Sequence, residues 1–323
     1  MSYSPMAAAR GLIMVFGLLT VPLSQAATPA GAAELKVVVT SKPAHALTAA
    51  IMEGVGTPRL LVEGSTSPHT FTLKPSGAKA VSEADVFIRI SESIEPFTAK
   101  LVKVLPRTVD IVTLAETKGL EVLKRRRGAT FDAHDGHDGH ADHDDDDAGD
   151  AVDGHVWLDP ANTGKLAAAI ASALSEKAPQ HRERFEANAK ALENSVSAVT
   201  AEIMTRMKPL AGRPFVVFHD ATQYFERRFG LSATGSITVS PDVHPSAKRL
   251  NAIRAKIKAS KAVCVFSEPA YQERLVAAVT EGTSARPGVI DPEGLKLEPG
   301  PGLYVALMRS LADGFESCLG KPS

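Results

Sequence analysis

The sequence predicts an α/β protein with two lobes, each built on a mostly parallel sheet, and one long rigid helix that bridges them. Short apolar strands alternate with helices in both halves of the chain, which is typical of parallel sheets covered by helices. After the leader described below, about 297 residues remain, which is more than one hydrophobic core usually holds. Between the halves, apolar residues recur at helical spacing from residue 180 to residue 208, and this pattern predicts the bridging helix.

The chain begins with a pattern typical of a secretory signal peptide. Arg10 precedes the apolar stretch Gly11–Val21, and a run of small residues follows it. This apolar stretch is too short to cross a bilayer as a helix, so we expect residues 1–26 to be removed, with cleavage as late as residue 33 as an option. The mature protein is therefore expected to be exported without stable membrane insertion, and an uncleaved anchor is the alternative.

The first half, residues 34–178, contains the first expected sheet. Strands are expected at residues 35–40, 60–62 and 86–90, and helices at residues 44–53, 76–82, 95–105 and 162–177. Gly54 and Pro106 mark the ends of two of these helices, because glycine accepts the left-handed turn after a helix and proline cannot continue one.

A run rich in histidine and aspartate interrupts this half between Asp132 and Asp153. It holds ten aspartates and four histidines spaced three residues apart, namely His134, His137, His140 and His143. The run lacks the apolar residues needed for a core, so we expect a solvated, disordered loop. Imidazole and carboxylate groups bind divalent cations, which predicts auxiliary metal sites in the loop. An acidic spacer that only improves solubility is the alternative.

The bridging helix is expected within residues 179–210. Its apolar residues form one stripe at steps of three and four: Phe185, Ala189, Leu192, Val196, Val199, Ile203 and Met207. At 1.5 Å per residue the helix is roughly 43 Å long, which suits contact with both halves of the protein. The C-terminal lobe then covers residues 211–323, with strands expected at 215–218, 262–267 and 288–290 and helices at 221–229, 246–259, 271–279 and 304–318.

Charge and cysteine content narrow the class of protein. Without residues 1–26 the chain has 35 basic and 37 acidic residues and no basic patch of the kind that binds nucleic acid. The only cysteines are Cys264 and Cys318, and an even pair in an exported protein predicts a disulfide, with two buried thiols as the alternative. The bond would close a loop of 54 residues, for which the chain-entropy estimate is about 4 kcal/mol.

Candidate metal ligands follow the expected strands of the second half. His219, Glu268 and Asp291 stand at three successive strand ends, where ligands of open α/β sheets bind. Each also has an ordinary structural explanation, as a core or capping histidine, a carboxylate at a helix start, and an Asp-Pro turn. The first half offers His69 and His155, and no short metal or nucleophile motif is present anywhere in the chain.

Four segments around these residues occur in the same order in a known family. They read S-P-H-T-F-T-L-K-P-S around His69, H-V-W-L-D-P at His155, F-V-V-F-H-D-A-T-Q-Y-F-E around His219, and V-C-V-F-S-E-P at residues 263–269. The chain resembles the periplasmic zinc-binding proteins of bacterial high-affinity zinc-uptake ABC transporters, the ZnuA type of solute-binding protein. The resemblance covers essentially the whole mature chain, including the His- and Asp-rich loop and the D-P-E-G turn at Asp291.

The resemblance implies a periplasmic, monomeric binding protein that is not an enzyme and that holds Zn2+ in the cleft between its lobes. His69, His155 and His219 would be the ligands, and Cys264 and Cys318 would form a disulfide. Some relatives have a glutamate ligand just before the first histidine, where this chain has Pro68, so the fourth ligand is expected to be water or Asp291. A cognate ABC permease and its ATPase would be the partners.

Three other functions fit parts of the sequence. A manganese-binding protein of the same fold is one, although three neutral imidazoles suit zinc better than manganese. A metal-buffering or adhesin-like protein without a transporter is the second. An exported zinc hydrolase, with Glu268 or Asp291 as general base, is the third. For the His- and Asp-rich loop, the hypothesis is that it collects zinc for the cleft or reports zinc sufficiency.

Overall fold

The computed structural model describes residues 1–3, 34–131, 152–238, 240–241, 243–271 and 273–321, and residues from Leu35 onward form one compact unit. Most of the expected signal peptide and all four histidines of the His- and Asp-rich loop lie outside the described residues. Within the described ranges, no helix combines the length and the apolar character needed to cross a membrane.

The first lobe contains a four-stranded parallel sheet in the order β2-β1-β3-β4. Its strands are β1 (Val37–Val39), β2 (Arg59–Leu60), β3 (Val86–Arg89) and β4 (Asp110–Thr113). The helices of this part of the chain are α1 (Lys42–Ile51), α2 (Pro75–Ser82), α3 (Thr98–Leu101) and α4 (Pro160–Lys177). Asp159 caps the start of α4 by accepting a hydrogen bond from the Ala161 amide, and Pro160 fits the first helical position.

The second lobe repeats this arrangement, with parallel strands in the order β6-β5-β7-β8. Its strands are β5 (Phe215–His219), β6 (Ala233–Thr238), β7 (Cys264–Ser267) and β8 (Arg286–Val289). Its helices are α6 (Gln223–Phe229), α7 (Ala247–Ser260), α8 (Glu273–Thr280) and α9 (Leu303–Leu319). The predicted fold class, two α/β lobes with parallel sheets, is confirmed.

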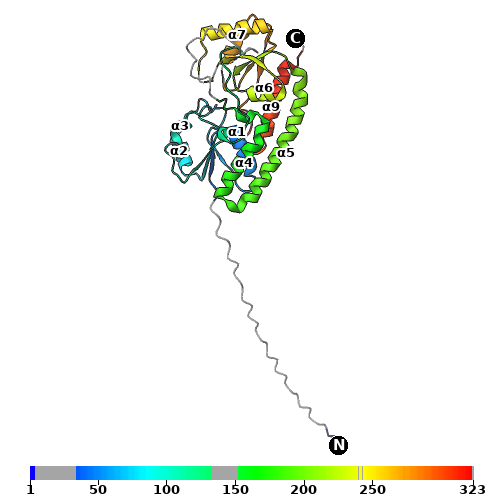
Figure 1. Ribbon diagram of the computed structural model, residues 1–323. Helices are drawn as coiled ribbons and strands as arrows, with labels where there is room; N and C mark the ends of the chain where they lie inside the picture. The colour runs from blue at the N-terminus through cyan, green and yellow to red at the C-terminus, as the bar shows by residue number, and fades with distance from the viewer. Residues whose placement is uncertain (4–33, 132–151, 239, 242, 272, 322–323) are drawn as a thin grey trace. The chain divides into compact units, whose positions relative to one another are not determined.

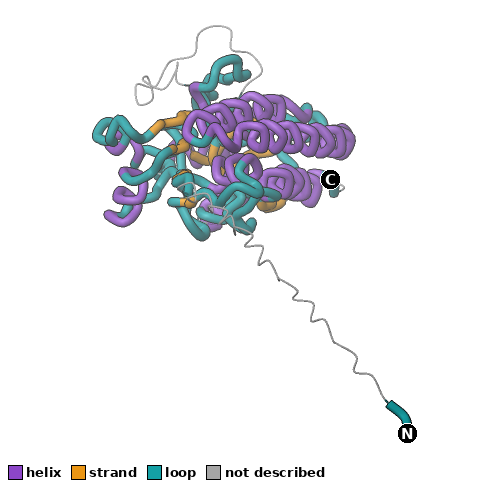
Figure 2. Tube along the Cα trace, turned by 90° about the horizontal axis from the view of Figure 1, so that it is seen from below, coloured by secondary structure: helices purple, strands orange, loops and turns teal. Residues whose placement is uncertain are grey.

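Each sheet is covered by apolar contacts on both faces, because successive side chains of a strand point to opposite sides. In the first sheet, Val37 and Val39 face the main core, whereas Val38 and Phe87 face a small cluster under α2. In the second sheet, Phe215, Val217, Cys264 and Phe266 face the main core, whereas Val216, Phe218 and Val265 face α7 and α8. Figure 2 shows the strands among the surrounding helices and loops.

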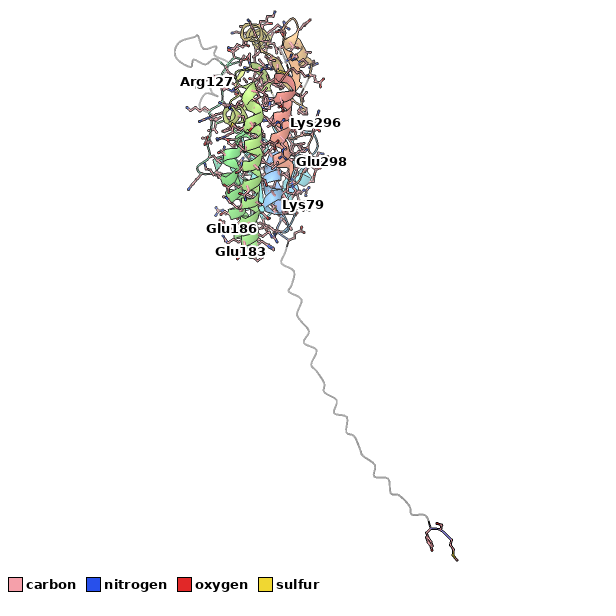
Figure 3. All side chains as sticks on the ribbon, turned by 90° about the vertical axis from the view of Figure 1, so that its right-hand side faces the viewer. Lys79, Arg127, Glu183, Glu186, Lys296 and Glu298 are labelled. Atoms are coloured by element: carbon pink, nitrogen blue, oxygen red, sulfur yellow. A yellow bond between two sulfur atoms is a disulfide. The ribbon has the colours of Figure 1, made fainter. Side chains whose placement is uncertain are left out.

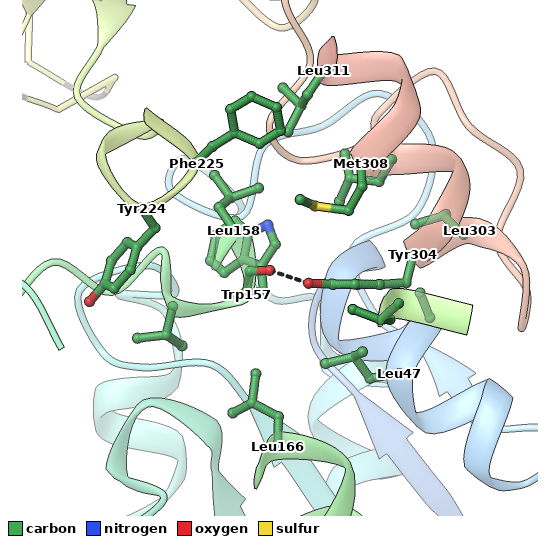
Figure 4. Packing of buried hydrophobic residues seen from close by; sticks show 14 of the residues in the cluster. Leu47, Trp157, Leu158, Leu166, Tyr224, Phe225, Leu303, Tyr304, Met308 and Leu311 are labelled. Carbon is green, nitrogen blue, oxygen red and sulfur yellow. Dashed lines mark hydrogen bonds between the residues drawn. The ribbon is translucent and has the colours of Figure 1, made fainter. Parts of the chain in front are cut away.

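One large apolar core is shared by both lobes. Figure 4 shows its centre, where Trp157 and Leu166 of the first lobe meet Phe225 and Met308 of the second. The Tyr304 hydroxyl donates a hydrogen bond to the Trp157 carbonyl at 2.6 Å, so the polar atoms in this core are also paired across the lobes. One face of each sheet packs against this shared core and the other against a smaller cluster of its own lobe. The boundaries of the lobes at residues 178 and 210 remain predictions.

The predicted bridging helix is α5 (Arg182–Met207). Its apolar stripe is buried at six positions: Phe185, Leu192, Val196, Val199, Ile203 and Met207. The helix packs against α1 and α4 of the first lobe and against α9 of the second, beside which it runs in Figures 1 and 3. Arg206 and Arg309 add ion pairs between α5 and α9 on the exposed side.

Two strands and one helix differ from the sequence-based expectation. Strands β4 and β6 were not predicted, because both lie at sheet edges and carry polar or half-exposed residues instead of an apolar run. Helix α3 spans only Thr98–Leu101, since Glu95 and Pro96 belong to the preceding loop. There the buried Glu95 carboxylate accepts hydrogen bonds from the Thr40 and Ser41 hydroxyls and from the Ile90 amide.

The expected disulfide is present between Cys264 and Cys318. It joins β7 to α9, and both cysteines are buried in the main core. The bond therefore ties the last helix of the chain to the central strands of the second sheet.

Candidate metal centre

Three histidines from distant parts of the chain meet at one point. His69 lies in the loop after β2, His155 lies directly before the short 3-10 helix Val156–Leu158, and His219 is the last residue of β5. They are 8%, 6% and 1% exposed. One ligand nitrogen from each lies within 4.8 Å of the other two, and in the described part of the chain they form the single group of metal-competent side chains of this kind. We call them the three-histidine group.

The spacing within the group suits a single small ion. Nε2 of His155 and Nε2 of His219 are 3.4 Å apart, and the ring centroids of the three pairs are 5.3 to 5.5 Å apart. Two nitrogens bound to one tetrahedral zinc lie about 3.3 Å apart, because each Zn–N bond is about 2.0–2.1 Å long. The cavity beside the group has a volume of about 20 Å³, which is enough for an ion and little more.

Each histidine ring makes a hydrogen bond to a partner outside the three-histidine group. Asp153 Oδ1 lies 2.7 Å from Nδ1 of His155, and Glu268 Oε1 lies 2.7 Å from Nδ1 of His219. The ring of His69 bonds to the backbone of Ser93. With Nδ1 donating its proton to a carboxylate, Nε2 carries the free electron pair and faces the centre of the group. These partners fix both the tautomer and the direction of the ligand atoms.

Burial controls the protonation of the group. Burial, and then the neighbouring charges of the other histidines, place the pKa of His69 and of His155 well below the usual value for histidine, so both stay neutral. Burial would also lower the pKa of His219, but the charge and hydrogen bond of Glu268 outweigh it and raise this pKa. Burial raises the pKa of Asp153 to about 7. A bound dication would favour the neutral imidazoles and the ionised carboxylates.

A buried ionic network supports the site from the side of the second lobe. Arg126 donates to Asp220, the residue after His219, and to Glu226 of α6 at 2.8 Å. Arg126 precedes a segment that pairs with the edge strand β6. In this pairing the Phe131 amide donates a hydrogen bond to the Thr234 carbonyl. The network thus connects the chain just before the His- and Asp-rich loop to the strand end that carries His219.

We expect the protonation of His219 to contribute to the pH dependence of zinc affinity. Zinc must displace a proton from this ring, so affinity should fall about tenfold per pH unit as the pH drops through the raised pKa of His219, beginning above pH 6.5. Glu268→Gln removes the charge that raises this pKa and should move the contribution of His219 to lower pH. Chelator competition at a series of pH values measures both curves, and identical curves would contradict this role of Glu268.

The three-histidine group does not include Asp291, His45 or His244. Both carboxylate oxygens of Asp291 accept backbone hydrogen bonds at 2.9 Å, from Leu295 and Lys296. His45 is buried against the Pro58 carbonyl, and His244 is exposed. Asp153 was assigned to the solvated loop by its composition, but it is buried and holds His155. The pattern D-x-H was the available signal for this pairing.

The sequence reasoning also missed Glu293. This residue is 2% exposed, and its Oε1 lies 3.7 Å from Nε2 of His69. Burial raises its pKa to about 8. Its place two residues after Asp291 in the D-P-E-G turn gave no hint of the direction of its side chain.

Comparison with known proteins places the chain in a family. The model of the family described as "Zinc-uptake complex component A periplasmic" (ZnuA) matches residues 37–318. The chain belongs to this family of periplasmic zinc-uptake components. The match covers both lobes, the three-histidine group and the disulfide, so the predicted resemblance is confirmed.

Individual relatives agree with this assignment. The high-affinity zinc uptake system protein ZnuA of Brucella suis biovar 1 is 46% identical over 306 residues, covering 88% of this chain and 92% of the relative. A laminin-binding adhesin (Lmb) mutant from Streptococcus agalactiae has a similar structure, with a TM-score of 0.71 and 25% identity over 88% of this chain and 99% of that one. A crystal structure of ZnuA has a TM-score of 0.68 at 23% identity, over 87% and 99% of the two chains, and shows likeness of fold.

Proposed function

We propose that this family member captures Zn2+ in the periplasm with His69, His155 and His219 and delivers it to an ABC permease driven by its ATPase. The observation that carries the proposal is the convergence of three buried imidazole nitrogens within 4.8 Å of one another. Zn2+ is the cargo, and neutral imidazoles are ligands that it prefers. The chain would act as a monomer that meets its partners through the exposed surface of the lobes.

Zinc is favoured over manganese by the chemistry of the group. Manganese prefers harder sets rich in carboxylate and carbonyl oxygens, whereas three imidazoles form a softer and neutral set. The curated relatives are also named as zinc uptake proteins. The adhesin description belongs to the streptococcal neighbour, and we do not extend it to this chain.

We also propose that the chain binds zinc without catalysing hydrolysis. A hydrolase would need a carboxylate free to act as general base beside the metal. Of the two candidates from the sequence, Glu268 Oε1 is hydrogen-bonded to His219, and both oxygens of Asp291 are hydrogen-bonded to backbone amides. These bonds favour a structural role for both residues, and a metal-bound Glu293, the carboxylate near His69, would also be unavailable as a general base.

Calorimetric zinc titration tests the proposal. The mature protein is compared with a deletion of residues 132–150 and with the same deletion carrying His155→Ala and His219→Ala. The deletion must stop before Val152 and Asp153, because Val152 pairs with Lys124 and Asp153 binds His155. We expect one tight site to survive the loop deletion and to vanish with the histidines.

Loss of the tight site on deletion of the loop would contradict the proposal. If all zinc binding left with residues 132–150, the cleft assignment would fail and a metal-buffering role would replace it. Equal stoichiometry and equal transfer rates with and without these residues would instead reject the hypothesis that the loop collects zinc for the cleft.

A further inference from the structure

A buried carboxylate stands beside the three-histidine group with one oxygen unused. Glu293 Oε1 accepts a hydrogen bond from the Ser67 hydroxyl at 2.8 Å and lies 3.7 Å from Nε2 of His69. Among the residues that the structure describes, neither Glu293 Oε2 nor His69 Nε2 has a hydrogen-bond partner, although both are buried. Buried polar atoms without partners are costly, so these two atoms indicate a missing ligand.

The turn that carries Glu293 is fixed from several directions. The Asp291 carboxylate accepts from the amides of Leu295 and Lys296, and the Trp157 indole donates to the Pro292 carbonyl at 3.1 Å. Lys42 of the first lobe reaches across to the carbonyls of Leu295 and Leu297 at 2.7 and 2.8 Å. Gly294 supplies the left-handed conformation of the turn, with φ +67°. Asp291 therefore shapes the turn, and Glu293 is the side chain that the turn presents to His69.

We propose that Glu293 is the fourth ligand of the bound ion. This proposal rests on the proposed function, since it completes the site formed by the three histidines. Glu293 Oε1 lies 3.7 Å from Nε2 of His69, close to the distance of about 3.3 Å between two ligand atoms of a tetrahedral zinc. Glu293 is not one of the side chains whose ligand atoms all lie within 4.8 Å of one another, so its side chain has to turn toward His155 and His219 to bind the ion. Ser67 holds Oε1, and Oε2 is free to make this contact.

A glutamate ligand changes the character of the site. With three imidazoles and one carboxylate the zinc is four-coordinate, and no position remains for water. Such a closed site binds the ion without generating a metal hydroxide, which is what a carrier requires. The carboxylate also reduces the net charge of the buried ion and its ligands by one unit.

Cobalt substitution tests this ligand directly, because the visible absorption of Co2+ reports its ligands. The wild-type protein, Glu293→Gln and Glu298→Gln, all lacking residues 132–150 so that the loop cannot bind Co2+, are loaded with Co2+ and titrated with azide. Glu298 is exposed in the same segment (Figure 3) and provides the matched control. We expect azide to change the spectrum of Glu293→Gln, where water replaces the carboxylate, and to leave the spectra of the wild type and of Glu298→Gln unchanged. Zinc affinity should fall ~10-fold or more in Glu293→Gln alone.

Failure of this proposal differs from failure of the proposed function. If azide already changes the wild-type spectrum and Glu293→Gln binds zinc as tightly as the wild type, Glu293 is not a ligand, while the three-histidine site stands. If Asp291→Asn rather than Glu293→Gln opens the site to azide, the fourth ligand is Asp291. If Co2+ and Zn2+ fail to bind the wild type after deletion of residues 132–150, the proposed function itself is wrong. Unchanged thermal unfolding of the metal-free Glu293→Gln protein confirms that the substitution leaves the fold intact.

Discussion

Replacing His219 by alanine lowers zinc affinity by about a hundredfold to a thousandfold. A full set of four ligands binds zinc with about 10–16 kcal/mol, so one ligand contributes about 2.5–4 kcal/mol. His219 is the most deeply buried of the three histidines, and its removal also leaves the Glu268 carboxylate without its partner. Chelator competition measures the dissociation constant of the variant and of the wild type, both lacking residues 132–150 so that the loop cannot contribute.

His244→Ala is the matched control for this substitution. His244 is exposed and lies outside the three-histidine group, so its loss should leave the zinc dissociation constant unchanged. His155→Ala should behave like His219→Ala, because its Nε2 faces the same point at 3.4 Å from that of His219. An affinity loss of less than about tenfold in both variants would mean that these histidines do not bind the zinc.

Removing the disulfide should cost about 4 kcal/mol in the free energy of unfolding. Cys264 and Cys318 are separated by 54 residues, and the chain-entropy model assigns this value to a loop of that length. The loss is large compared with the about 5–15 kcal/mol that stabilises a typical domain. Urea unfolding of the double variant Cys264→Ala and Cys318→Ala, followed by far-ultraviolet circular dichroism, gives the difference from the oxidised wild type.

Two conditions make this comparison interpretable. The titrations are done on zinc-free protein with a chelator present, because bound zinc would add its own stability to the native state. The reduced wild type is included, and it should resemble the double alanine variant. A difference of less than about 1 kcal/mol between oxidised and reduced protein would contradict the prediction.

The helices and central strands could be predicted because their patterns are local. The stripe from Phe185 to Met207 has the spacing of a helix, and all of its large apolar members are buried against neighbouring helices. Edge strands β4 and β6 lack such a pattern, because β4 is only partly buried and β6, although mostly buried, consists largely of small and polar residues. The shared core could not be predicted from sequence patterns either. The burial of Trp157 against residues of α9 depends on how parts of the chain that are distant in sequence pack together.

The metal centre, too, could be predicted only in part. His69, His155 and His219 were identified as candidates from strand ends and from a family resemblance, and the structure brings them together. The carboxylates around them were harder to identify. Asp153 was hidden within an acidic run, and Glu293 was overlooked in favour of Asp291. The carboxylate of Asp291 is engaged by the backbone amides of Leu295 and Lys296, and the spacing of residues in the sequence does not reveal such bonds.

The most direct test of the central claim is a diffraction experiment on crystals of the zinc-loaded mature protein. Data collected on both sides of the zinc absorption edge locate the metal without reference to the protein. We expect the strongest anomalous peak at a point about 2.0–2.1 Å from one nitrogen of each of His69, His155 and His219. A strongest peak elsewhere, with the three imidazoles bonded only to one another or to water, would contradict the assignment of this site.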